Sequence, residues 1–363
     1  MWDRRPAYNN TAAVAESATA SAVKTAYYCL FAVAYFVAGG FADAVMVNSS
    51  WTKGHIDALW RLPRADGSSA GATVMHGVWR PLLRALGIVA NRPASRLVYP
   101  PCNVEVFAAL PLSRAQFPGG GRVVVSVAQF RPEKDHALQL RAFAAFRKRG
   151  GNAVADVRLL LIGGCRDEGD AKRVEELRSL ARELQLLPRD AVEAAAGDGG
   201  NGDGAAPRVL PSVEFMINAP FTELERALGC ATAALHTMWN EHFGISVVEA
   251  MAAGALPIAH ASGGPKADIV VPLRIAGQDT MRRPGFLAAT VDEYADALLA
   301  VVSMPEKERL MLASAGRTHA LTEFSDDRFQ MGVYRALLPL VREGLDAARE
   351  HRRADAEARR ILS

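Results

Sequence analysis

Short apolar runs alternate with helical patterns between residues 123 and 260, and this alternation limits the fold more than any other feature of the chain. Strands that are apolar on both faces and alternate with helices indicate a parallel sheet covered by helices on both sides. Ligands of such sheets bind beyond the carboxyl ends of the strands. The runs are VVVSVAQF (123–130), VRLLLIGG (157–164), SVEFMI (212–217), ATAALHTM (231–238) and ALPIAH (255–260), and the helical patterns cover 135–149, 170–185, 221–229 and 244–254.

The pattern predicts three parts along the chain. Residues 1–113 contain only two strand-like stretches, which amount to a partial domain at most. Residues 114–322 form a complete, doubly wound α/β domain. Residues 323–363 are C-terminal helices that pack back toward the N-terminal part. The Gly-rich stretch 197–207 is expected to be a surface insert within the α/β domain.

The composition excludes several classes of protein. A net charge of +3 over 363 residues gives no electrostatic support to nucleic-acid binding. The four cysteines lie more than sixty residues apart, without a C-x-x-C pair. This spacing argues against a zinc site or a disulfide framework and fits a reducing compartment.

The apolar run AYYCLFAVAYFVAGGFA, residues 26–42, is a candidate membrane segment. Its uncharged length is at the lower limit for a membrane span, and Gly39 and Gly40 weaken it as a helix. Lys24 and the pair Tyr27 and Tyr28 suit a membrane interface. A buried helix that leads into the next strand, a membrane-surface contact and a full span all remain open.

Candidate ligand-binding residues follow the first two strands of the α/β domain. Arg131 and Lys134 come after VVVSVAQF, three residues apart at a helix start, where a guanidinium and an ammonium can clamp a diphosphate. Two solvated surface cations are the alternative. Gly163 and Gly164 follow VRLLLI, where they either admit a ligand to the backbone or form a plain turn.

The segment NEHFGISVVEAM, residues 240–251, follows the strand ATAALHTM and carries two carboxylates. Gly244 opens a helix whose free N–H groups can hold phosphate oxygens. Glu241 precedes that helix and Glu249 lies within it, so both can accept hydrogen bonds from the hydroxyls of one elongated ligand. A metal site is disfavoured, since no third carboxylate stands at ligand spacing, and His242 is a structural or sugar-contacting imidazole. The alternative for the two carboxylates is a helix cap and a buried salt bridge.

A fourth loop, HASGGPK at residues 260–266, follows the strand ALPIAH. Gly263 and Gly264 permit a tight backbone pass, and Pro265 positions Lys266. Four loops that offer cations, amides and carboxylates at one sheet edge fit a nucleotide diphosphate sugar. They fit NAD less well, because no G-x-G-x-x-G stands between a strand and a helix.

These motifs together resemble a known family. The E-x7-E pattern in NEHFGISVVEAMAAG is similar to the signature of the retaining family 4 glycosyltransferases of the GT-B fold. Within that family, the chain most resembles the GDP-mannose-dependent α-1,2-mannosyltransferases that extend the dolichol-pyrophosphate-linked oligosaccharide on the cytosolic face of the endoplasmic reticulum. The blocks that carry this resemblance are VMVNSSWT, VYPPCNV, SVAQFRPEKDH, LLIGGCR, HTMWNEHFGISVVEAMAAG and HASGGPKADIV.

The resemblance implies roles for particular residues. Mannose would be transferred from GDP-mannose with retention of configuration and without a metal or other cofactor. Arg131 and Lys134 would hold the diphosphate, Glu249 the ribose, and Glu241, as the catalytic residue, the mannose. The remaining donor-binding residues would be Gly163, His242, Phe243, Gly244, Ile245, Gly263, Gly264 and Lys266.

The sequence also departs from the family pattern. GT-B enzymes have two Rossmann-like domains, and residues 1–113 provide too few strands for a complete acceptor domain, so an N-terminally truncated chain is expected. We expect this chain alone to bind the donor, to transfer little mannose and to associate with membrane through residues 26–42. Two alternatives stay open. One is a non-catalytic GDP-sugar-binding partner protein, and the other is a retaining GT-B enzyme that uses a different nucleotide sugar.

Overall fold

The computed structural model describes residues 17–39, 41–60, 94–112, 117–118, 120–187, 211–275 and 280–362, with side chains up to residue 354. The chain divides into two compact units. One unit is Pro101–Ser325, and the other combines Met1–Pro100 with Asp326–Ser363. The predicted insert at 197–207 lies outside the described residues.

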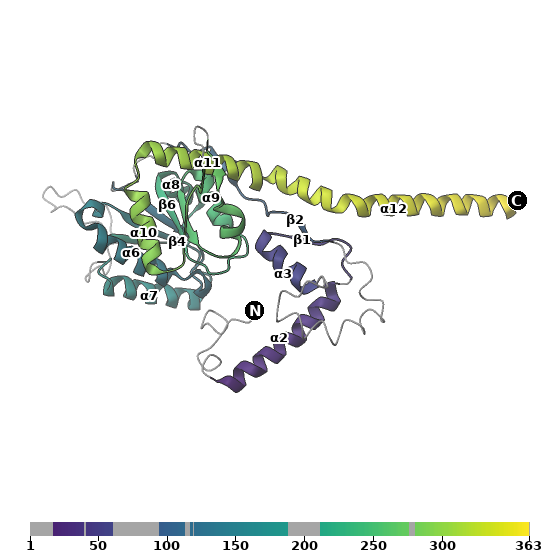
Figure 1. Ribbon diagram of the computed structural model, residues 1–363, viewed down its shortest axis with the longest axis horizontal. Coiled ribbons are helices and arrows are strands. Elements are labelled where there is room, and N and C mark those ends of the chain that lie inside the picture. The colour runs from purple at the N-terminus through teal and green to yellow at the C-terminus, as the bar shows by residue number, and fades with distance from the viewer. Residues whose placement is uncertain are drawn as a thin grey trace. The chain divides into compact units, whose positions relative to one another are not determined.

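The unit Pro101–Ser325 is built on a six-stranded sheet in which every pairing is parallel (Figure 1). The strand order is β10-β7-β6-β3-β4-β5. After β3 the chain forms β4 and β5 on one side of it, and then β6, β7 and β10 on the other side. This is the doubly wound order predicted from the apolar runs, and the fold class is confirmed. The strands are β3 Val123–Val127, β4 Arg158–Gly163, β5 Val213–Ile217, β6 Ala231–His236, β7 Leu256–His260 and β10 Phe286–Ala288.

Strand β10 is absent from the sequence prediction. It has three residues and pairs with β7 at one edge of the sheet. A run this short, Phe-Leu-Ala, gives no periodicity from which a strand can be read. The same holds for the two-residue strands β8 Leu273–Arg274 and β9 Met281–Arg282, which form a small antiparallel pair.

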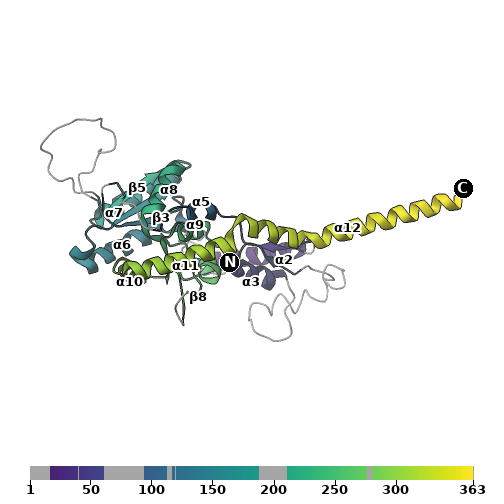
Figure 2. The same cartoon turned by 90° about the horizontal axis from the view of Figure 1, so that it is seen from above.

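Helices flank the sheet in two groups (Figure 1, Figure 2). Helix α6 packs against α7 and α10, and α9 packs against α5, α8 and α11. The helices are α5 Val104–Ala108, α6 His136–Gly150, α7 Glu168–Glu183, α8 Phe221–Cys230, α9 Ile245–Ala253, α10 Val291–Val302 and α11 Glu306–Phe324, with the short turns η1 Pro132–Lys134, η2 Gly151–Val154 and η3 Pro265–Ile269.

Helix α6 shows how the sequence builds one of these layers. Asp135 caps its first turn by accepting a hydrogen bond from the Leu138 N–H, which satisfies a donor that the helix leaves free. Leu140, Phe143 and Phe146 follow at three-residue spacing and are fully buried against the core. Burying each such side chain stabilises the fold by about 1.5–3 kcal/mol. The spacing of the apolar residues thus fixes which face of α6 meets the sheet.

Residues 101–112 belong to the same unit as the sheet. Helix α5 packs against α9 and α11, and Leu112 lies where a side chain on Gly254 would stand, while Leu110 borders Gly229 at contact distance. The boundary predicted from the sequence, between 113 and 114, lies thirteen residues later than the unit boundary after Pro100. Pro100 and Pro101, which end the preceding extended segment, mark that boundary in the sequence.

The other unit contains α2 Ala18–Gly39, α3 Ser50–Trp60, α12 Asp326–Leu362 and the strands β1 Met46–Val47 and β2 Arg96–Leu97. The two strands pair in parallel. Helix α12 packs beside them, because Val98 fills the space over Gly332 and the Arg96 side chain donates to the carbonyl of Arg335. The C-terminal helix thus packs on the strands of the N-terminal unit.

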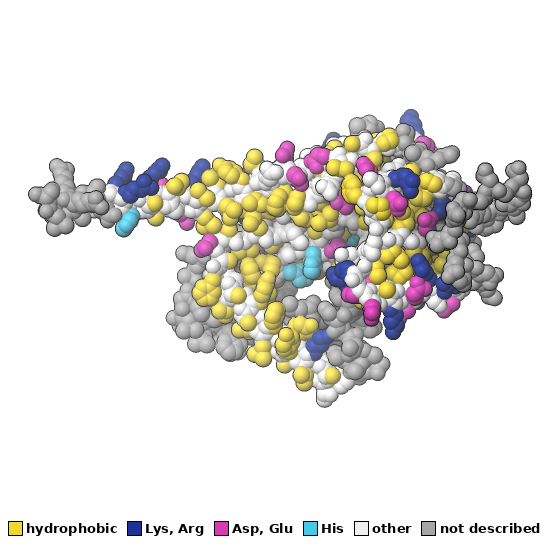
Figure 3. Space-filling view, turned by 180° about the vertical axis from the view of Figure 1, so that it is seen from behind, with side chains coloured by type: hydrophobic (Ala, Val, Ile, Leu, Met, Phe, Trp, Pro, Cys, Tyr) yellow, Lys and Arg dark blue, Asp and Glu magenta, His cyan; other side chains and the backbone are white. Residues whose placement is uncertain are grey.

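Helix α2 is long and apolar enough to cross a membrane, by length and composition. It begins eight residues before the predicted apolar run, at Ala18. Most of its surface is exposed, including Val23 at 71% and Leu30 at 73%. In Figure 3, hydrophobic side chains line much of the visible side of this unit's helices.

Gly163 at the end of β4 generates a stability prediction. A Cβ at this position would lie 2.0 Å from the carbonyl oxygen of Ala128, whereas the nearest atom to a Cβ at Gly164 would be 3.8 Å away. We expect Gly163→Ala to destabilise the chain by about 1–3 kcal/mol, as overpacking of a core does. Gly164→Ala is the matched control and should change the urea midpoint much less. Equal effects of the two substitutions would contradict this packing role.

Candidate functional site at the switch point of the sheet

The site begins with an ion pair between two loops at the carboxyl ends of β3 and β6. These neighbouring strands are where the strand order reverses, the position at which open α/β sheets hold ligands. Lys134 ends the turn η1 after β3, and Glu241 lies in the loop after β6. The Lys134 Nζ donates to Glu241 Oε2 at 2.6 Å, and the two side chains are 22% and 15% exposed.

Side chains beneath the pair hold both loops in place. The Thr237 hydroxyl lies 2.7 Å from the carbonyl oxygen of Lys134, to which it donates, and it accepts from the Gln139 amide at 2.9 Å. The buried Tyr294 hydroxyl donates to the carbonyl of His236 at 2.9 Å. Each bond joins different segments, so the end of β6 is fastened to the loop after β3 and to α10. These hydrogen bonds therefore hold the backbone on both sides of the ion pair in place.

Glu241 has further donors besides Lys134. The imidazole Nε2 of His236 lies 3.3 Å from Oε2, and the backbone N–H of His242 donates to Oε1 at 3.1 Å. Burial by itself would raise the pKa of Glu241, but the hydrogen bonds from His236 and Lys134 and the charge of Lys134 outweigh it and lower that pKa to about 2. The carboxylate is therefore ionised throughout the neutral range.

The loop after β7 is hydrogen-bonded to the loop that carries Glu241. The Gly264 N–H donates to the Glu241 carbonyl at 2.8 Å, and the Asn240 N–H donates to the Ser262 hydroxyl at 2.8 Å. Gly263 has a φ of +62°, and a Cβ there would lie 2.2 Å from the Glu241 carbonyl oxygen. The close backbone approach predicted at Gly263 and Gly264 is present, and the backbone that approaches them belongs to the loop that carries Glu241.

Helix α9 begins directly after the loop that carries Glu241. Gly244 is its N-cap, with a φ of +109° and no side-chain cap, a conformation that glycine adopts most readily. Phe243 is buried and packs edge-on against Phe324 at 5.4 Å between ring centroids, so it anchors the loop to the core. Ile245 and His242 are exposed.

Two other predicted residues lie around this helix. Glu249 is half-buried and accepts a hydrogen bond from the backbone N–H of Asn103. Burial raises the pKa of Glu249, and that hydrogen bond offsets part of the rise. Lys266, on the turn η3, is exposed.

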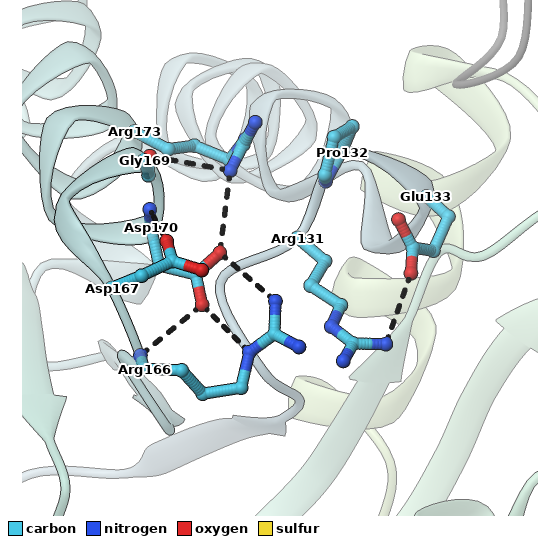
Figure 4. A pocket seen from close by; sticks show the side chains of 8 residues that line it. All are labelled: Arg131, Pro132, Glu133, Arg166, Asp167, Gly169, Asp170 and Arg173. Carbon is cyan, nitrogen blue, oxygen red and sulfur yellow. Dashed lines mark hydrogen bonds and ion pairs between the residues drawn. The ribbon is translucent and has the colours of Figure 1, made fainter.

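Arg131 points to a different place from Lys134. It lines a cavity of about 370 Å³ between η1 and the start of α7, which Figure 4 shows from close by. Its guanidinium lies 3.6 Å from Glu133, whereas Arg166 and Arg173 both approach Asp170. In this structure the two predicted diphosphate cations have separate acidic partners. The cavity is lined by Arg131, Pro132, Glu133, Arg166, Asp167, Gly169, Asp170 and Arg173.

The structure adds residues that the sequence analysis did not single out. His236 and Thr237 support the ion pair, Asn103 donates to Glu249, and Ser262 joins two loops. One signal was available, because His236 and Thr237 are polar residues at the end of an otherwise apolar run. Asn103 donates its own backbone N–H to a distant side chain, and the Ser262 hydroxyl accepts from a distant backbone N–H, contacts that no local pattern reports. Among the described residues, no three His, Cys, Asp or Glu side chains gather as a metal site would require.

Comparison with known proteins agrees with this geometry. Residues 1–60 match the family model "ALG11 mannosyltransferase N-terminus", and residues 208–319 match "Glycosyl transferases group 1". Among solved structures, a sucrose-phosphate synthase from Thermosynechococcus elongatus superimposes with a TM-score of 0.54 at 21% identity, covering 85% of this chain and 62% of that one. Anabaena HepE in complex with UDP and glucose gives 0.51 at 16% identity, covering 82% and 63%. These likenesses support the fold.

The doubly wound sheet and the structural neighbours show a fold of the GT-B class, and residues 208–319 carry the group 1 match. Within that class its homologues are the GDP-Man:Man(3)GlcNAc(2)-PP-Dol alpha-1,2-mannosyltransferases, which confirms the resemblance found in the sequence. Identity is 40% over 325 residues to the Homo sapiens protein and 38% over 330 residues to the Mus musculus protein. These alignments cover 89% and 91% of this chain but 54% and 55% of the relatives, so the chain spans about half their length.

The lowered pKa of Glu241 predicts how stability depends on pH. A carboxyl group whose pKa falls on folding stabilises the fold above its unfolded pKa, and that stability is lost as the pH falls through the folded pKa. For Glu241 the loss runs from pH 4.5 down to about 2. Wild type should exceed Glu241→Gln in unfolding free energy by up to about 3 kcal/mol near pH 6, with the difference vanishing near pH 2.

Urea unfolding of both proteins at a series of pH values measures this difference. The two proteins share every other titrating group, so their difference isolates Glu241. A difference that stays constant from pH 6 to pH 2 would show that the carboxylate is not held by charged partners.

Proposed function

We propose that the chain acts in the transfer of α-1,2-linked mannose from GDP-mannose to a dolichol-pyrophosphate-linked oligosaccharide, with retention and without a metal. Curated homologues at 38–40% identity carry this activity in their names. The observation that carries the proposal is the ion pair of Lys134 and Glu241 at the switch point, where a nucleotide sugar would meet both groups.

The ion pair suits an exchange of partners. In the free protein Lys134 neutralises Glu241 at 2.6 Å. A diphosphate is a stronger acceptor for an ammonium than a single carboxylate, because it offers more charge and more oxygens. When Lys134 turns to the diphosphate, Glu241 becomes free to accept hydrogen bonds from the hydroxyls of mannose. One event thus holds the leaving group and orients the sugar.

The surroundings of the pair supply the other contacts of the proposal. The N-terminus of α9, opened by Gly244, offers backbone N–H groups and a favourable dipole to phosphate oxygens. Arg131, with a loose 3.6 Å contact to Glu133, is free to turn toward the diphosphate at small cost. Glu249 would exchange its hydrogen bond from Asn103 for the ribose hydroxyls. Lys266 and His242, both exposed, would reach the donor from the rim.

The catalytic contribution of the chain is orientation and electrostatics. Glu241 fixes the sugar ring, and Lys134 with Arg131 stabilises the negative charge that develops on the departing diphosphate. The three loops are already fastened to one another by Thr237, Ser262 and Gly264, so these groups need little reorganisation when the donor binds.

We also propose that the protein works at the cytosolic face of the endoplasmic reticulum membrane. Its support is α2, whose apolar surface is mostly exposed. Lys24 lies over the ring of Tyr28, and Tyr27 packs edge-on against the same ring, a cation and two aromatic residues of the kind found at membrane interfaces.

A second candidate is a GDP-sugar-binding partner protein without transfer activity. The observation behind it is that all the proposed donor contacts lie within residues 101–325, while the chain spans about half the length of its relatives. Donor binding without transfer would support this candidate, so binding and transfer must be measured separately.

Donor binding is the first test. GDP and GDP-mannose should raise the melting temperature, because a ligand at a hundredfold excess over its dissociation constant stabilises the folded state by about 2.7 kcal/mol. UDP-glucose is the matched control and should shift the melting temperature much less. Equal shifts by both sugar nucleotides would favour a different donor, and no shift by either at millimolar concentration would overturn donor binding.

Transfer is the second test. The chain is joined to the part of the Mus musculus relative that it does not match, and radiolabelled mannose is followed into dolichol-linked lipid with EDTA present. We expect transfer in EDTA and its loss in Glu241→Ala, since the sugar is then no longer oriented. Glu308→Ala, which removes a carboxylate paired with Arg282, is the control and should leave transfer unchanged.

Loss of transfer on adding EDTA would contradict the metal-independent mechanism. Binding of GDP-mannose with no transfer by the fusion, under conditions where the intact mouse protein transfers, would favour the partner-protein candidate.

A further inference from the structure

We infer that His236 is a positioning residue for Glu241: its Nε2 keeps the carboxylate in place when Lys134 leaves it for the diphosphate, a role that rests on the proposed function. The contact itself is a property of the ligand-free protein. Its Nε2 lies 3.3 Å from the same oxygen, Oε2, that Lys134 contacts at 2.6 Å.

His236 is fixed more firmly than Lys134. It is the last residue of β6, its side chain is 6% exposed, and its carbonyl accepts from the buried Tyr294 hydroxyl. Lys134 is 22% exposed and sits on a flexible four-carbon stem at the end of a 3₁₀ turn. A ligand therefore displaces the lysine at small cost, whereas the histidine stays with the sheet.

The exchange of partners needs such a residue. Glu241 is 15% exposed, and a carboxylate that loses its cation at this depth retains few donors. Of the donors described around it, the His242 N–H reaches Oε1, and His236 remains for Oε2. Without His236, the oxygen left by Lys134 would have no protein donor to hold it at a defined angle to the sugar.

The contacts of the imidazole agree with a donor at Nε2. A hydrogen bond from Nε2 to a carboxylate places the proton on Nε2, and Nδ1 is buried without a hydrogen-bond partner. Three other groups lie near His236: Lys134 on η1, Tyr294 on α10 and His136 on α6. The pKa of His136 is lowered to about 4, mainly by burial. Glu241 is the acidic group in contact with it.

Substitutions at His236 separate the hydrogen bond from the packing. The amide nitrogen of Gln reaches the position of Nε2, whereas the shorter Asn places its amide near Nδ1. Leu keeps much of the volume and removes both ring nitrogens. Retention of function in His236→Gln, with its loss in both His236→Asn and His236→Leu, would therefore identify a donor at the Nε2 position.

The first experiment uses the full chain without ligand, so its result does not depend on the proposed function. His236→Leu, Glu241→Gln and the double variant are unfolded in urea. If the two residues are in contact, the midpoint shift of the double variant will be smaller than the sum of the single shifts. Additive shifts would overturn the contact. If His236→Leu does not fold, the same cycle is made with His236→Asn.

The second experiment measures the dissociation constants of GDP and GDP-mannose by calorimetry. His236→Leu and His236→Asn should weaken GDP-mannose by about tenfold, as expected for a lost charged hydrogen bond, and GDP by less than about twofold. His236→Gln should restore GDP-mannose binding to within about threefold of wild type. His319→Leu, which removes a half-buried imidazole, is the control and should change neither constant.

The outcomes are distinguishable. Equal weakening of GDP and GDP-mannose, or no restoration by Gln, would show that His236 acts through packing and would overturn the inference. A wild-type chain that binds neither ligand would overturn the proposed function, while the ligand-free cycle would still decide whether His236 holds Glu241.

Discussion

The reversal of strand order between β3 and β6 is the constraint on which the rest of the site depends. The strands are parallel neighbours, but the chain leaves them toward opposite sides of the sheet, which opens a crevice at their carboxyl ends. Lys134 and Glu241, 107 residues apart in the sequence, meet in that crevice at 2.6 Å. A charged pair at this depth is costly unless other donors support it, and His236 with the His242 N–H provides that support.

Backbone contacts between loops give the crevice its shape. Gly263 and Gly264 let the loop after β7 approach the carbonyl of Glu241 closely, and Thr237 ties the end of β6 to the loop after β3. Glu241 is therefore held by its main chain and by its side chain together. In the proposed exchange of partners, the Lys134 side chain moves to the diphosphate while these contacts keep the Glu241 carboxylate in place.

Several predictions from sequence succeeded for a stated physical reason. Five of the six strands of the large sheet were found, each ending within three residues of its apolar run, because a strand buried on both faces must be apolar throughout. The family resemblance was confirmed by homologues at up to 40% identity. The roles of Arg131, Lys134, Glu241 and the other donor-binding residues stay predictions, and the structure supplies their partners. Strand β10 was missed because three residues carry no period.

The sequence by itself determined the succession of strands and helices along the chain, the loops that carry polar residues, and the family resemblance. These follow from apolar periodicity and local motifs, which are properties of neighbouring residues. Only the tertiary structure decided which polar residues meet. It paired Lys134 with Glu241 and Arg131 with Glu133, gave Glu249 a backbone donor in Asn103, and brought His236 to the carboxylate. Lys134 and Glu241, like Asn103 and Glu249, lie more than a hundred positions apart, so their contacts depend on strand order and leave no mark on the sequence near either residue. The pairs Arg131–Glu133 and His236–Glu241 are close in the sequence, but the geometry of each loop decides which side chains meet.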